Sequence, residues 1–209
     1  MTDLLSVGGV VLLMLAIGLS VPHWLKRWRM DREFSALQRT LGSGQIQSRP
    51  FGWPSFSGVF LGRPCGINFE TTLIHSAHGA LGDLAARYRV GLAHRVDYSV
   101  SFAKRRLFSR WFGRRSGNGA VAISVGGHLW HVVSSHSTGA GRLANDPAVA
   151  EALKSLSVCT IVTLDREWME ALEVEVSRRE LHVDRFVSML TLLTALAGAV
   201  ETCLNPLTH

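Results

Sequence analysis

Histidine is the residue type that first raises the question of metal chemistry in this chain, which has 9 of them. His75 and His78 are three residues apart, and so are His128 and His131. On a helix this spacing brings two imidazoles to one metal ion, whereas on a strand it points them to opposite faces. We expect His128 and His131 on a strand, and no cysteine or carboxylate completes either pair. The sequence therefore predicts no metal site.

The cysteines and hydroxyl side chains do not form a recognisable catalytic set either. Cys65, Cys159 and Cys203 are far apart and include no CxxC pair, which favours buried thiols in a reducing compartment over a zinc site or a disulfide framework. The chain has no GxSxG, no P-loop and no GxGxxG after a strand. The run Ser134 to Ser137 places hydroxyls beside His136, but neighbours at a strand end do not form a triad. We predict a protein that is not an enzyme and has no cofactor.

The clearest chemical signal in the part of the chain that we expect to be soluble is a basic and aromatic segment, KRRLFSRWFGRR. On a helical wheel its large apolar side chains share an arc of about 140°, with three arginines outside it, as in helices that lie on a membrane surface. The alternatives are a solvated loop whose aromatics pack on the domain, and an RNA-binding segment, which a nearby membrane anchor makes the weaker explanation. The residues predicted to contact a membrane or partner are Lys104, Arg105, Arg106, Leu107, Phe108, Arg110, Trp111, Phe112, Arg114 and Arg115.

That nearby anchor is predicted from an apolar run at the start of the chain. Leu4 to Val21 are consecutive uncharged residues, about 27 Å of helix at 1.5 Å per residue, close to the thickness of bilayer hydrocarbon. Only Asp3 precedes the run, and basic and tryptophan residues follow it, whereas a cleaved signal peptide has the reverse charge order. We therefore expect a retained transmembrane helix. The flanking residues expected at lipid headgroups or against a partner are Trp24, Lys26, Arg27, Trp28 and Arg29.

Charge distribution predicts the orientation of this anchor. Residues 1–115 contain 16 Lys and Arg against 6 Asp and Glu, whereas residues 116–209 contain 6 against 10. Because positive charge next to a span marks the cytoplasmic side, we expect the N-terminus outside and the C-terminal domain in the cytoplasm, at the inner membrane of a bacterium. The lipid bilayer, anionic lipid headgroups and other membrane subunits are the expected partners. Nucleic acid is not, because basic residues do not extend through the domain.

The remaining sequence predicts a domain of mixed helix and strand. Met30, Phe34, Leu37 and Leu41 share one helical face, which extends the first helix to the glycines at 42 and 44, and residues up to Pro54 resemble a linker. The ranges expected to form the domain are a hairpin of 59–61 and 65–69, a short helix at 84–88, a strand at 92–102, a hairpin of 121–125 and 128–133, a helix from Asp146 to Leu156, a hairpin of 159–164 and 172–176, and a helix at 180–203.

The last helix contains the uncharged run Phe186 to Val200, so a second span has to be weighed. The run is shorter than usual spans, includes hydroxyl residues, and has Asp184, Arg185 and Glu201 at its ends. We interpret it as a core helix that covers one face of the sheet. Domain boundaries are then a transmembrane anchor at 1–22, a juxtamembrane helix and linker at 23–56, and a cytoplasmic domain at 57–209.

The order of these elements resembles a loose group of uncharacterised bacterial single-pass membrane proteins with a cytoplasmic α+β domain. The resemblance extends from Ser57 to Leu204 and is carried by the hairpin GVFLGRPCGINF, with Gly62 and Arg63 in its turn, and by the helix start at Asn145, Asp146 and Pro147. The chain departs from the group at 71–89 and 104–115. The likeness implies an architecture and no site residues.

Taken together, the sequence predicts an α+β protein, with an N-terminal transmembrane helix followed by a mainly antiparallel sheet covered by helices. A chain with an anchor, basic and aromatic flanks and no catalytic residues suits an accessory subunit of a larger membrane complex, for which a respiratory or photosynthetic complex is a candidate host. The glycines at 8, 9 and 18 would let another helix approach closely. The alternative is a free-standing tethered domain that binds a soluble partner or anionic lipid in signalling or envelope upkeep.

Overall fold

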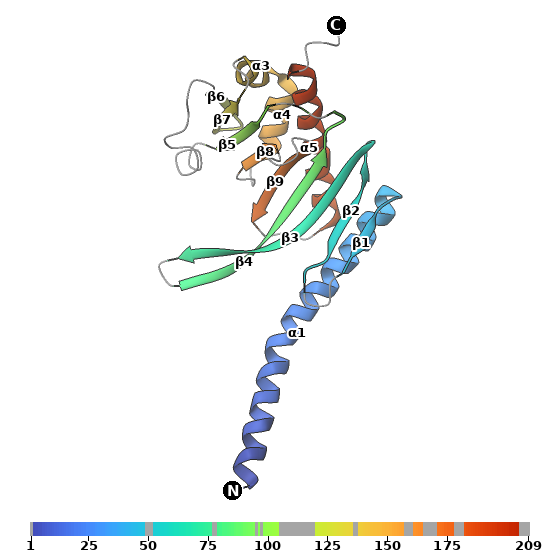
Figure 1. Ribbon diagram of the computed structural model, residues 1–209, viewed down its shortest axis with the longest axis vertical. Helices are drawn as coiled ribbons and strands as arrows, with labels where there is room; N and C mark the ends of the chain where they lie inside the picture. The colour runs from blue at the N-terminus through green and yellow to red at the C-terminus, as the bar shows by residue number, and fades with distance from the viewer. Residues whose placement is uncertain are drawn as a thin grey trace.

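The computed structural model describes residues 2–48, 52–76, 79–94, 96, 98–104, 120–135, 138–156, 161–164, 171–177 and 182–204. Among these residues one antiparallel sheet has nine strands in the order β1-β2-β3-β4-β9-β8-β5-β7-β6. Helices lie against the sheet, and the N-terminal half of α1 projects from the body as a stalk (Figure 1). The predicted α+β class with an antiparallel sheet is confirmed.

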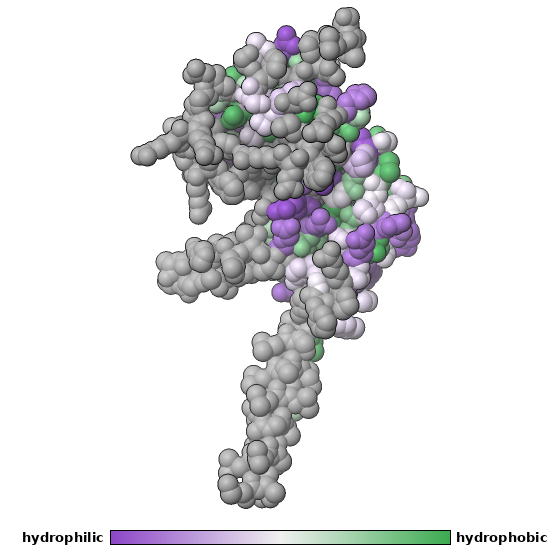
Figure 2. Space-filling model, in the orientation of Figure 1, coloured by the Kyte–Doolittle hydropathy of each residue, from purple (hydrophilic) through white to green (hydrophobic). Residues whose placement is uncertain are grey.

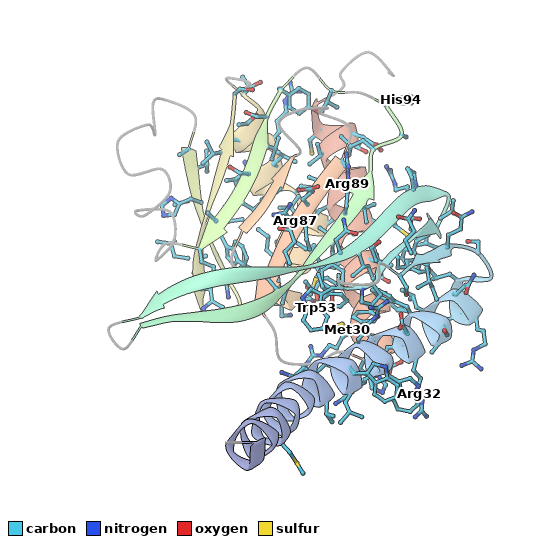
Figure 3. The ribbon with its side chains drawn as sticks, turned by 60° about the horizontal axis from the view of Figure 1, so that its bottom comes forward. Met30, Arg32, Trp53, Arg87, Arg89 and His94 are labelled. Carbon is cyan, nitrogen blue, oxygen red and sulfur yellow. The ribbon has the colours of Figure 1, made fainter. Side chains whose placement is uncertain are left out.

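Helix α1 (Thr2–Leu41) is continuous from the predicted span into the domain. Its predicted inner face is confirmed, because Met30, Phe34 and Leu37 are fully buried in the core. The helix ends where the sequence predicts, at Gly42, whose φ of +67° is a conformation that glycine adopts without strain. Figure 3 shows Met30 on the side of α1 that faces the sheet and Arg32 on the opposite side.

The first part of the sheet is an antiparallel meander. Strands β1 (Gln45–Gln47), β2 (Ser55–Phe60), β3 (Arg63–Ser76) and β4 (Gly79–Gly91) pair in chain order. The hairpin predicted at 59–69 is confirmed, with a tighter turn at Leu61 and Gly62. The linker predicted to reach Pro54 contains β1, because Ile46 pairs with Phe56 and packs against the core.

The short helix predicted at 84–88 is wrong, because these residues belong to β4. Ala86, Tyr88 and Val90 are buried at a spacing of two, opposite Phe69, Ile67 and Cys65 on β3. Leucine, alanine and arginine favour helix locally, but cross-strand packing of every second side chain outweighs that preference here.

The strand predicted at 92–102 is also wrong in its first part. β4 ends at Gly91, and the next strand, β5 (Val100–Lys104), pairs with β7 and β8 in the other part of the sheet. A side chain at position 91 would collide with Pro64, so glycine is required there. Leu92 and Val96 are buried as the alternation predicts, but in a connection between strands.

Three predicted features of the second part of the sheet are confirmed. β6 (Ala120–Val125) and β7 (His128–Ser134) form a hairpin whose two glycines have positive φ. β8 (Ile161–Leu164) pairs antiparallel with β9 (Ala171–Ser177). Helix α4 (Pro147–Ser155) begins after Asp146, whose Oδ1 accepts a hydrogen bond from Ala148 N at 2.7 Å. The short helix α3 (Gly139–Asn145) was not predicted.

The core lies between the sheet and its helices. Helix α5 (Val183–Leu204), close to the predicted helix at 180–203, packs on β4, β9, α1, α3 and α4, and α3 and α4 lie against β6 and the second half of the sheet. Aromatic rings gather at its centre: Phe34 lies 5.9 Å from Phe56, 5.6 Å from Phe69 and 5.5 Å from Phe186, by centroids. Tyr88 is 6.2 Å from Phe186. We call these five aromatic residues the aromatic cluster.

The aromatic cluster predicts the effect of truncating its central ring. Phe34→Ala should lower the free energy of unfolding by about 3–5 kcal/mol, because it leaves a cavity among three other rings. Chemical denaturation of the full chain in mild detergent measures this change. Trp28→Ala is the matched control, since it removes an exposed aromatic from the same helix and should change stability by less than about 0.5 kcal/mol. Equal losses in the two variants would contradict the assignment.

Candidate membrane and partner interface

The residues of α1 predicted to flank the span lie on a face that the domain leaves open. At 100° per residue, Trp24 and Trp28 are about 120° and 160° from Met30, which faces the core. Their exposed fractions are 63% and 54%, and Leu25 is also exposed. Lys26 and Arg29 are exposed and Arg27 is half-buried. Aromatic and basic side chains in this arrangement suit the headgroup region of a bilayer or the surface of a neighbouring membrane protein.

Polar contacts attach the next turns of α1, from Asp31 to Gln38, to the domain. Glu33 Oε2 accepts a hydrogen bond from Val183 N at 3.0 Å, which satisfies a backbone donor at the start of α5. Asp31 Oδ1 accepts from Ser48 Oγ at 2.9 Å. Gln38 Nε2 donates to Gly44 O at 2.7 Å. With the aromatic cluster, these bonds leave no flexible joint between the tryptophans and the sheet.

The second predicted contact segment is described only at its start. Lys104 is the last residue of β5, and its Nζ lies 5.2 Å from the ring centroid of Trp130, a cation–π arrangement. The structure therefore places this lysine against the domain. The other predicted residues of the segment lie outside the described residues: Arg105, Arg106, Leu107, Phe108, Arg110, Trp111, Phe112, Arg114 and Arg115.

The face of the sheet opposite the aromatic cluster carries paired charges. Arg87 Nη2 lies 2.9 Å from Glu70 Oε2, and Arg89 Nε lies 3.8 Å from Glu173 Oε1. Figure 2 shows hydrophilic side chains gathered in the middle of the molecule, and Figure 3 shows Arg87 and Arg89 along β4. Because both signs alternate on neighbouring strands, this surface suits solvent better than a phosphate or nucleic-acid backbone.

A partly buried ion pair that the sequence did not predict holds the end of α5. Arg63 Nη1 and Nη2 donate to both carboxylate oxygens of Glu201, at 2.8 and 2.6 Å, and Nη1 also lies 3.3 Å from Gly91 O. Ala93 N donates to the same carboxylate. We call this set of contacts the Glu201 clamp. Burial raises the pKa of Glu201, but the bonds from Arg63 and Ala93 outweigh burial and hold that pKa below its usual value.

A second group of contacts lies close by on the last turns of α5. Tyr98 Oη donates to Val200 O at 3.2 Å, and Cys203 Sγ lies 3.2 Å from Asp146 Oδ2. Burial and the neighbouring carboxylate raise the pKa of Cys203 to about 11, so it stays a thiol at neutral pH. Burial also raises the pKa of Cys65 to about 11. Neither described cysteine has the low pKa of a nucleophile.

Helix α5 is long and apolar enough to cross a membrane by length and composition, over Val183–Cys203. One of its faces is buried against the sheet, with Phe186, Leu190 and Leu193 fully inaccessible. Three of its hydroxyls, on Ser188, Thr191 and Thr202, donate to backbone carbonyls four residues back, for example Thr191 Oγ1 to Val187 O at 2.9 Å. Among the described residues no second helix meets this length and composition, and the transmembrane helix expected near the N-terminus stays a prediction.

The histidines do not assemble a site in the described part of the chain, where no group of three or more His, Cys, Asp or Glu side chains could hold a metal ion. His128 and His131 both lie on β7, where a spacing of three points them to opposite faces as expected. Ser135 Oγ accepts a hydrogen bond from Ser99 N at 2.9 Å, whereas His136 and Ser137 lie outside the described residues.

The Glu201 clamp predicts a pH-dependent contribution to stability. Because folding lowers the pKa of Glu201, its contribution is present above the unfolded pKa, about 4.3, and is lost as the pH falls through the folded value. Glu201→Gln should therefore cost about 1–3 kcal/mol at pH 7 and progressively less below pH about 4. Denaturation of parent and variant at several pH values checks this. A gap between them that does not shrink in acid would contradict it.

The similarity of this chain to known proteins is one of fold. No family model matches the chain, and no curated protein matches it. Among solved structures it is similar to the mycobacterial trehalose monomycolate transport factor A, TtfA, with a TM-score of 0.55 and 10% sequence identity, over 86% of this chain and 98% of that chain. At this identity the likeness concerns the fold, which is therefore shared with a transport factor.

Proposed function

We propose that this chain is a non-catalytic, membrane-anchored accessory subunit of a larger membrane protein complex. The observation that carries the proposal is the continuity of α1, which runs from the predicted span into the aromatic cluster without a joint. A tether for a freely moving domain needs a flexible linker, whereas a brace for neighbouring subunits needs fixed distance and direction. The rigid attachment favours the brace.

The first 22 residues anchor the chain in this proposal, with the N-terminus outside and the domain in the cytoplasm. The exposed Trp24 and Trp28 and the basic residues beside them contact anionic headgroups or a neighbouring subunit. The resemblance to bacterial single-pass proteins with a cytoplasmic α+β domain belongs to the same proposal. Nucleic acid is not a proposed partner.

The fold neighbour bears on which kind of complex is the host. TtfA is named as a transport factor for trehalose monomycolate. A membrane transport assembly therefore becomes the first host to test, ahead of a respiratory or photosynthetic complex. The second candidate function is a free-standing tethered domain that binds a soluble partner or anionic lipid. The charges of both signs around Arg87 and Arg89 favour a soluble partner.

Mild-detergent purification tests the accessory role directly. The full chain, tagged after His209 and expressed in its native host, should co-purify with the same membrane proteins at constant stoichiometry by mass spectrometry. Trp24→Ala with Trp28→Ala should reduce that yield, because both rings lie on the open face of α1. Purification of a lone chain under several mild detergents would instead favour the free-standing domain.

The proposed topology has its own test. A reporter that fluoresces only in the cytoplasm, fused after His209, should be bright, because the basic residues after the span keep the C-terminal side of the chain in the cytoplasm. The matched control moves the positive charge, by changing Lys26, Arg27 and Arg29 to Gln and adding lysines before Leu4, and it should dim the signal. A dark fusion of the parent that carries an active periplasmic reporter instead would overturn the topology.

A further inference from the structure

We draw no further inference here: the strongest candidate, the two-stranded arm that residues 71–76 of β3 and 79–84 of β4 form beyond the reach of β2 and β9 (Figure 1), carries none because nothing in the described part of the chain shows what pairs with its outer edges.

Discussion

The packing of Phe34 against Phe56, Phe69 and Phe186 is the contact on which the placement of the rest depends. It joins α1 to two strands and to α5, so a single helix belongs both to the predicted membrane anchor and to the core. Rings in contact at these distances cannot slide without opening a void, and interiors tolerate voids poorly. Every surface of the domain therefore has a fixed distance and direction from the first residues of α1.

Helix α5 explains why composition alone cannot distinguish a span from a core helix. Its buried face carries Phe186, Leu190, Leu193 and Leu196, and its less buried positions include Ser188 and Thr191. Those hydroxyls donate to carbonyls four residues back, so the helix presents few free polar groups. The average hydropathy of α5 is that of a membrane-spanning helix, whereas the positions of its apolar residues are those of a helix that packs one face on a sheet.

Local patterns carried most of what the sequence could predict. The inner face of α1 at Met30, Phe34 and Leu37, the Gly126–Gly127 turn and the cap at Asp146 each depend on residues within one or two turns of chain. The failures at 84–88 and 92–102 depend on which strand pairs with which, and β4 pairs with β9, far along the sequence. The Glu201 clamp was invisible for the same reason, because Arg63 and Glu201 are 138 residues apart. The segment at 105–115 lies outside the described residues and stays a prediction.

The Glu201 clamp and the aromatic cluster act on the two ends of the same unit. The cluster and Glu33 fix the start of α5 to α1, and the clamp fixes its last turns to Arg63, at the base of the β2–β3 turn. A force applied at that turn is thus carried through α5 to α1 with no intervening loop. Rigid packed elements change position together, since cores deform in discrete steps and not continuously. A displacement of the turn would therefore also move the part of α1 that carries Trp24 and Trp28.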